Sequence, residues 1–231
     1  MAEPKEGTVT FDRDHYPEGL NANFLVSDAE ALEAKYSGAK GLFTDPETRD
    51  IARNVPDILE ALGDLKGKQI VDLGSGTGLF LNFLDAAVGP KGHVYAVEIS
   101  PGFVELLRKK KEDEGLSNTS IVLGNTTNSE LPADLKVDMV LLIDVYHHIE
   151  YVQTYMTKVR EGMRTGAELV LIDFHRIPEK IWSHPPEWVL SHVRAGQDVF
   201  RAELEQAGFV FQREVTLPKL QENYFMIFTN P

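Results

Sequence analysis

Short apolar runs alternate with amphipathic segments along most of the chain. The runs are rich in β-branched and aromatic residues and predict strands at 69–73, 93–99, 121–123, 137–143, 169–174, 209–215 and 224–228. The segments between them carry apolar residues at helical spacing and predict helices at 79–88, 102–114, 151–163 and 197–207. Strands that alternate with helices in this way are typical of βαβ units, so the sequence predicts an α/β domain with a mostly parallel sheet.

Residues 1–43 lack this periodicity, and we expect loops there with one short helix near 27–36. Aromatic side chains are scattered among acidic residues and glycines in this segment. Tyr16, Phe24 and Tyr36 either form a lid over the domain or simply pin the segment to it. We therefore treat residues 1–43 as an N-terminal extension or lid.

The domain itself is expected to occupy residues 44–231. Thr44 is a candidate helix cap and Pro46 suits the first turn, so they predict a helix that runs toward residue 62. Pro56 falls inside that helix and predicts a kink or a break, because proline lacks the N–H that continues the hydrogen-bond ladder.

The composition narrows the classes of function. Acidic residues outnumber basic ones by 36 to 23, and the formal charge of −13 repels phosphate backbones, so we expect no nucleic-acid partner. The chain has no cysteine, which excludes disulfides, thiolate metal sites and cysteine nucleophiles. We expect a soluble, cytoplasmic protein, because the chain has no run of about 18 apolar residues and its first residues are polar.

A glycine-rich loop follows the first predicted strand of the domain. Gly74, Gly76 and Gly78 allow the backbone to turn tightly and to approach a ligand closely. The dinucleotide fingerprint G-x-G-x-x-G would place its third glycine at the position of Leu79, which disfavours an NAD(P)-dependent oxidoreductase. Asp72 precedes the loop, and an acid there suits a cationic cofactor better than a diphosphate.

An acidic residue follows this loop at an informative distance. Glu98 lies twenty residues after Gly78, at the end of the second predicted strand. In a doubly wound sheet, a carboxylate at that place reaches the ribose hydroxyls of a nucleoside bound across the strand ends. The glycine loop and Glu98 together therefore predict a nucleoside-containing ligand.

Five segments in order resemble the class I S-adenosylmethionine-dependent methyltransferases. They are VDLGSGTG at 71–78, VYAVEIS at 94–100, IVLGNTT at 121–127, DMVLLIDVYHHI at 138–149 and MRTGAELVLIDF at 163–174. The resemblance covers about residues 66–230. It implies a Rossmann-like seven-stranded, mostly parallel sheet with an antiparallel last strand and helices on both faces. It also implies S-adenosyl-L-methionine as the cofactor.

The resemblance also assigns residues to the cofactor. Those expected to bind it are Asp72, Gly74, Ser75, Gly76, Gly78, Glu98, Ile99, Asn125, Thr126 and Asp144. Members of the family often carry an acid beside the adenine amino group, whereas this chain has Asn125, whose amide oxygen can accept the same hydrogen bond. Asp144 is expected near the methionine ammonium group.

The methyl acceptor should meet the cofactor above the ends of the fourth and fifth predicted strands. Tyr146, His147 and His148 follow one of these strands and His175 follows the other, so these four are the candidate catalytic residues. A histidine is the natural base for an acceptor that must lose a proton. Alternatively, these histidines are structural and proximity alone drives the transfer.

Histidines and tryptophans gather in the part of the chain that follows. Five of the seven histidines lie between residues 147 and 192, but they show no helical i, i+4 pair and we predict no metal site. Trp182 and Trp188 lie in the segment 176–196 and either hold the substrate or anchor a helix on the sheet.

We interpret the chain as an enzyme that transfers a methyl group to a small-molecule acceptor. The acidic charge and the lack of an appended RNA- or peptide-binding module favour a small substrate. One alternative is a protein or RNA methyltransferase that a partner subunit recruits to its target. Another is a cofactor-binding module without catalysis, which tight binding without turnover would reveal.

Overall fold

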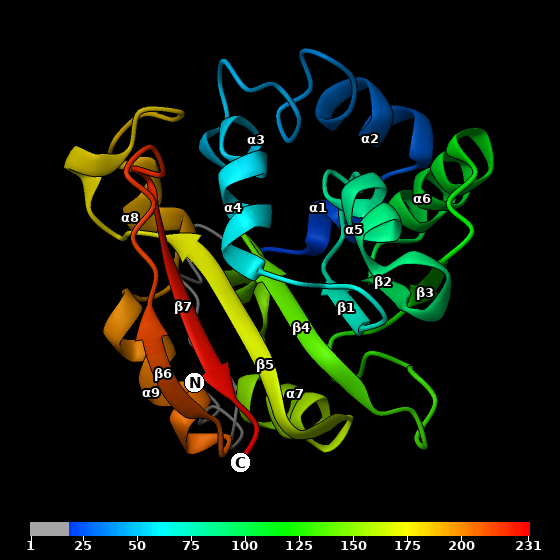
Figure 1. Ribbon diagram of the computed structural model, residues 1–231. Coiled ribbons are helices and arrows are strands. Elements are labelled where there is room, and N and C mark those ends of the chain that lie inside the picture. The colour runs from blue at the N-terminus through cyan, green and yellow to red at the C-terminus, as the bar shows by residue number, and fades with distance from the viewer. Residues whose placement is uncertain (1–18) are drawn as a thin grey trace.

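The computed structural model describes residues 19–231, so Tyr16 lies outside the described residues. A seven-stranded sheet with the order β3-β2-β1-β4-β5-β7-β6 forms its centre (Figure 1). The strands are β1 (Gln69–Leu73), β2 (His93–Glu98), β3 (Thr119–Leu123), β4 (Val137–Ile143), β5 (Met163–Phe174), β6 (Val210–Glu214) and β7 (Asn223–Thr229). Neighbouring strands are parallel except at β7, which runs antiparallel to both β5 and β6. The mostly parallel sheet with an antiparallel last strand is confirmed.

Helices cover both faces of the sheet. They are α1 (Ala22–Val26), α2 (Ala29–Tyr36), α3 (Asp50–Arg53), α4 (Val55–Leu62), α5 (Leu81–Val88), α6 (Pro101–Glu114), α7 (Val152–Glu161), α8 (Trp188–His192) and α9 (Gln197–Gln206), with short 3₁₀ turns η1 (Gly89–Lys91), η2 (Tyr146–His148) and η3 (Pro178–Lys180). Among residues 19–231, no helix combines the length and the apolar character needed to cross a bilayer.

The core consists of two apolar layers, one on each face of the sheet. Successive residues of β4 alternate between them: Met139 and Leu141 pack with α4, α5 and α6, whereas Val140 and Leu142 pack with α7 and α9. This alternation follows from the two-residue period of a strand. A strand buried on both faces reads as a continuous apolar run, which is how β4 reads in the sequence.

The carboxyl ends of the parallel strands meet at one edge of the sheet. Leu73 of β1 pairs with Val97 of β2 and with Leu142 of β4, and Ile143 pairs with Ile172 of β5. The segments that leave these strands are therefore neighbours in space although they are far apart in the sequence. The candidate site lies at this edge.

The helix predicted to start at Thr44 begins later than expected. Residues 44–48 form turns, and the side chain of Asp45 accepts a hydrogen bond from the N–H of Glu47 at 3.0 Å. This local bond offers the backbone an alternative to a helix. The predicted break is present, but it falls at Asn54, and Pro56 lies in the first turn of α4.

The N-terminal segment packs on α6 through aromatic rings. The ring of Phe24 lies 5.6 Å from that of Tyr36 and 5.8 Å from that of Phe103, between centroids. Phe43 lies 4.4 Å from Tyr36 and 6.1 Å from Phe103. The hydroxyl of Ser100 also donates to the carbonyl of Phe24 at 2.7 Å. We call Phe24, Tyr36, Phe43 and Phe103 the aromatic wall.

Candidate active site

The loop between β1 and α5 turns sharply because three glycines adopt left-handed backbone angles. Gly74, Gly76 and Gly78 have φ of +76°, +51° and +72°, which residues with side chains avoid. A Cβ on Gly74 would lie 2.2 Å from Cγ2 of Val145, so space as well as angle requires glycine there. A Cβ on Gly76 would approach Phe43 no closer than 3.7 Å, which is ordinary contact.

The carboxylate of Glu98, at the end of β2, ties this loop to the second strand. Its Oε2 accepts from the N–H of Gly76 at 2.9 Å, and its Oε1 accepts from the N–H groups of Ile99 and Ser100 at 2.8 and 2.9 Å. Burial raises the pKa of Glu98, while these three donors oppose the shift. A carboxylate has about four acceptor positions, so room remains for hydroxyl donors of a ligand.

Asp72 is a second buried acid beside the loop. Burial raises its pKa to about 6, and the charge of Glu98 adds to the shift while Ser75 opposes it. The hydroxyl of Ser75 donates to the backbone carbonyl of Asp72 at 2.8 Å and so closes the turn. A positively charged ligand would stabilise the ionised form of such an acid.

Asp144 follows β4 and is held on both sides. Nη2 of Arg49 donates to its Oδ2 at 2.6 Å, and Nδ2 of Asn223 donates to its Oδ1 at 2.5 Å. Burial raises the pKa of Asp144 to about 7, and the guanidinium of Arg49 acts against that shift. Its φ of +53° is unusual for a residue with a side chain, and such strain clusters at functional sites.

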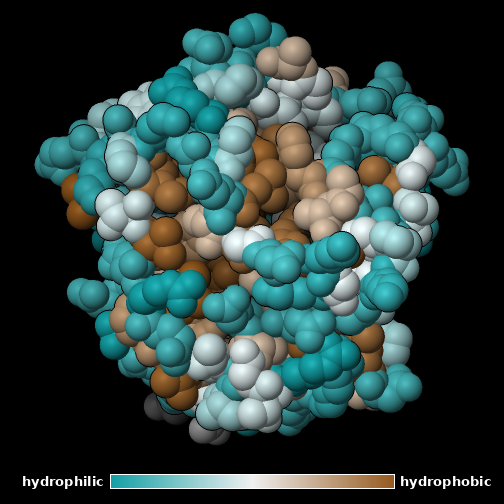
Figure 2. All heavy atoms as spheres, in the orientation of Figure 1, coloured by the Kyte–Doolittle hydropathy of each residue, from teal (hydrophilic) through white to brown (hydrophobic). Residues whose placement is uncertain are grey.

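Residues of the glycine loop, Glu98 and Asp144 border a cavity that opens to solvent. Its lining includes Gly74, Gly76, Glu98, Asp144 and His148, together with rings of the aromatic wall. Figure 2 shows apolar atoms in a hollow near the centre of this face, rimmed by hydrophilic residues. A mostly apolar lining with a few polar groups is typical of a small-molecule site.

A smaller cavity adjoins the first. Gly74, Gly76 and Asp144 line both cavities, and Asp72 and Arg49 line the second one. The acids of the site therefore face two spaces that share lining residues. Arg49 is a lining residue that the sequence analysis missed, since no local pattern links it to Asp144.

Asn125 and Thr126 both line the larger cavity, but the amide oxygen of Asn125 is already engaged. It accepts from the N–H of Thr127 at 2.9 Å and from the hydroxyl of Thr127 at 3.0 Å, while its Nδ2 donates to Glu130 at 2.7 Å. An amide oxygen has two lone pairs. The predicted bond from an adenine amino group would therefore require this turn to open.

Two adjacent histidines follow Asp144 in the chain, and they are placed differently: His148 lines the larger cavity, whereas His147 is buried and lines neither cavity. Nδ1 of His147 donates to Oδ1 of Asp173 at 2.7 Å, and the backbone N–H of His147 donates to Oδ2 at 3.1 Å. This bond engages Nδ1 of His147 and leaves Nε2 as its other ring nitrogen. His148 lines the cavity and contacts Phe24, with 5.9 Å between ring centroids.

The structure does not bring Tyr146 or His175 to this group. Tyr146 is fully buried, and its ring lies 5.0 Å from that of Phe200 in the core. Successive side chains of a 3₁₀ turn point about 120° apart, so η2 directs Tyr146 and the histidine after it to different surroundings. His175 packs on Tyr224 at 5.6 Å and lines neither cavity, and burial lowers its pKa to about 4.

Two further aromatic residues lie beside the paired histidines. His192 of α8 has its ring 5.1 Å from that of His147 and 5.2 Å from that of His148. Trp188 stacks on His192 at 4.4 Å and packs on the apolar layer that contains α7 and α9. Trp182 instead lies under the guanidinium of Arg53, at 4.3 Å. The two tryptophans thus have different surroundings.

A comparison with known protein families shows which family the chain belongs to. A family described as "Methyltransferase domain" matches residues 64–213. The chain belongs to the class I S-adenosylmethionine-dependent methyltransferases. The methyltransferase fold extends well beyond the matched residues, because a solved structure of an S-adenosylmethionine-dependent methyltransferase from Aquifex aeolicus covers 89% of this chain and 100% of its own, with a TM-score of 0.70 and 23% identity.

Curated relatives of this methyltransferase match over shorter stretches. A probable cobalt-precorrin-6B C(15)-methyltransferase from Sulfolobus acidocaldarius is 32% identical over 46% of this chain and 56% of its own length. A protein-L-isoaspartate O-methyltransferase from Methanothrix thermoacetophila is 33% identical over 32% of this chain and 37% of its own. The chain thus spans about half the length of the curated relatives it matches.

Proposed function

We propose that this methyltransferase uses S-adenosylmethionine to methylate a small-molecule acceptor that binds beside His147 and His148. The observation that carries the proposal is the shared cavity, in which Gly74 and Glu98 line one part and His148 lines another. The cofactor would lie with its ribose on Glu98 and its methionine part toward Asp72. Its methyl group would then point to the histidines.

The charges of the site suit this placement. The sulfonium and ammonium groups of the cofactor are cationic, and Asp72 and Asp144 are buried acids that, like Glu98, line one or both of the two cavities. Arg49 already pairs with Asp144 and would offer its remaining donors to the carboxylate of the cofactor. The methyl group would thereby be held in line with the acceptor, which is the main contribution of a protein to this reaction.

The acceptor is proposed to be a small molecule because the site is a cavity lined by apolar, aromatic and acidic side chains. The aromatic wall borders the cavity, and the formal charge of −13 disfavours approach of an RNA backbone. The names of the relatives above include both a precorrin and a protein substrate, so the acceptor class is argued from the cavity. If the acceptor must lose a proton, the candidate bases are His148, which lines the cavity, and His147, whose ring Asp173 orients.

The test is a turnover assay with fractionated cell extract. The chain is incubated with S-adenosylmethionine and either a fraction of metabolites, a protein fraction or an RNA fraction, and S-adenosylhomocysteine is quantified. The proposal expects turnover with the metabolite fraction. Turnover with protein or RNA alone would assign the acceptor to that class, and tight cofactor binding without any turnover would identify a non-catalytic module.

A further inference from the structure

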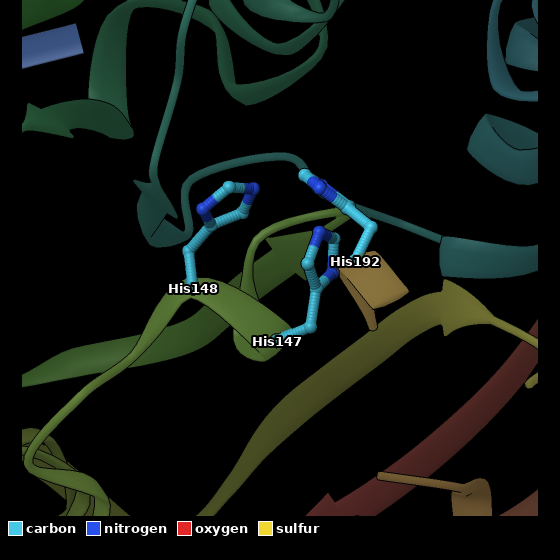
Figure 3. Close-up of side chains that lie close together, drawn as sticks. All are labelled: His147, His148 and His192. Carbon is cyan, nitrogen blue, oxygen red and sulfur yellow. The ribbon is translucent and has the colours of Figure 1, made fainter. Parts of the chain in front are cut away.

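Three histidines from two distant segments lie together beside the cavity, and of the three it is His148 that lines it. His147 and His148 belong to η2, and His192 belongs to α8. Each offers one ring nitrogen, and these three atoms all lie within 4.8 Å of one another. Figure 3 shows the three side chains leaning toward a common centre. Adjacency in the chain does not prevent His147 and His148 from serving one ion, because η2 brings their ring centroids to 4.3 Å.

A carboxylate orients the first of these rings. Nδ1 of His147 donates to Asp173, which is fully buried and also accepts from the N–H of Phe174 at 2.8 Å. Metal-binding histidines characteristically donate their second N–H to a carboxylate, which fixes the ring and leaves the other nitrogen for the ion. His147 has this arrangement.

The second ring has a buried nitrogen that nothing in the described part of the chain satisfies. Nδ1 of His148 is shielded from solvent and has no hydrogen-bond partner among residues 19–231. A buried polar atom without a partner is rare in folded proteins, and a bound ion or water would account for it.

The ring of His192, the third of the cluster, packs against a tryptophan. Trp188 stacks on His192, with an interplanar angle of 22°. The guanidinium of Arg176, which follows β5, donates to the carbonyls of Leu190 and Val193 at 2.8 Å each and so fixes the short helix α8 to the sheet edge. The position of His192 is therefore set by the same sheet edge that carries η2.

We propose that His147, His148 and His192 bind one divalent first-row transition-metal ion, such as Zn²⁺ or Fe²⁺. Imidazole ligands suit these ions. Two nitrogens bound at 2.1 Å to a tetrahedral ion lie about 3.4 Å apart, so the ligand atoms must approach by at most about 1.4 Å on binding. Asp173 supplies a negative charge behind His147, and the charge of Arg49 is balanced by Asp144.

Three protein ligands leave a coordination position open, as in catalytic zinc sites. Because His148 lines the cavity, that position would take an oxygen or nitrogen atom of the acceptor; this consequence rests on the proposed function. For a hydroxyl acceptor, the ion would favour loss of the proton to solvent. The new bond forms between oxygen and the methyl carbon, the carbon–sulfur bond breaks, and its electron pair stays on sulfur.

Metal binding is tested without acceptor or cofactor. The full chain, free of a histidine tag and stripped with a chelator, is titrated calorimetrically with Zn²⁺. One ion per chain is expected, and His148→Ala and His192→Ala should each weaken binding at least tenfold. His93→Ala is the matched control and should bind as the wild type does, because His93 opens β2 and pairs with Ser120. Wild-type binding in either cluster variant, or no binding by the wild type, overturns the proposal.

The place of the ion is tested separately with Co²⁺. Trp182→Phe leaves Trp188 as the single tryptophan, and its ring lies 4.4 Å from that of His192. Co²⁺ should quench its fluorescence at one equivalent, whereas stoichiometric binding with unchanged fluorescence would place the ion elsewhere and refute the site. Turnover without a metal site refutes only this inference. Metal binding without turnover refutes only the proposed function.

Discussion

Replacing Glu98 by glutamine tests the assignment of the ribose site. The two oxygens of the Glu98 carboxylate accept three hydrogen bonds from backbone N–H groups. A glutamine side chain keeps only one acceptor oxygen, because an NH₂ group takes the place of the other. If the amide oxygen keeps Ile99 and Ser100, the amide nitrogen faces the N–H of Gly76, which then loses its acceptor. Ribose hydroxyls would likewise lose a charged acceptor, which is worth about 1–3 kcal/mol. We expect the dissociation constant of S-adenosylmethionine to rise about 5- to 150-fold.

The effect of this substitution on stability should be smaller than its effect on binding. Loss of one buried acceptor costs about 1–3 kcal/mol, but removing a buried charge offsets part of that cost. Glu222→Gln is a matched control, because Glu222 is fully buried and its Oε1 accepts from the N–H groups of Trp182 and Ser183 at 2.5 and 2.7 Å. Glu222 lines neither cavity, so its variant should keep the affinity for the cofactor.

Calorimetry at 25 °C measures both affinities, and urea unfolding measures both stabilities. Weak binding in Glu98→Gln and normal binding in Glu222→Gln would support the ribose assignment. An unchanged dissociation constant in Glu98→Gln, in a variant that unfolds like the wild type, would refute it. NAD serves as the specificity probe, and micromolar NAD binding without S-adenosylmethionine binding would contradict the cofactor assignment itself.

Three further predictions concern the loop, the histidines and pH. Gly76→Val should abolish cofactor binding yet keep the fold, measured by calorimetry and circular dichroism, because valine disfavours a φ of +51° and enters the cavity. If the acceptor loses a proton, His147→Ala or His148→Ala should lower turnover by roughly 10²–10⁴-fold without melting, and His175→Ala should not; equal turnover in all three would make the histidines structural. Burial raises the pKa of Asp72 from 3.8 to about 6, so the native state binds more protons than the unfolded state between these values. This acid therefore lowers stability as pH rises from 3.8 to about 6, by about 3 kcal/mol at most, and Asp72→Asn should flatten urea-unfolding stability over that range.

The strands could be predicted because their signal is local. Val137–Ile143 forms β4 over the residues expected, since a strand covered on both faces needs a continuous apolar run. The glycine loop was equally legible, because left-handed turns at Gly74, Gly76 and Gly78 need glycine whatever surrounds them. Both patterns depend only on residues that are close together in the chain, so they can be read from the sequence without knowledge of the fold.

The missing parts of the site depend on partners far apart in the chain. Arg49 and Asp144 are 95 residues apart in the chain, and no sequence pattern predicts their ion pair. The crowding of histidines was visible, but only the folded sheet edge shows that His192 joins His147 and that Tyr146 turns into the core. The assignment of residues 1–43 as a lid and the cytoplasmic location stay predictions.

Through the aromatic wall, the N-terminal segment would be in direct contact with a bound cofactor. Phe24 precedes α2 in the chain, Phe43 follows it, and both line the cavity, so a bound cofactor would contact the chain on both sides of that helix. A short helix on a surface opens often, and its amide hydrogens then exchange with solvent. Occupancy of the cavity should therefore slow deuterium uptake in residues 29–36. The rate at which the amide hydrogens of α2 exchange would therefore report whether the cofactor is bound, although α2 lies outside the sheet.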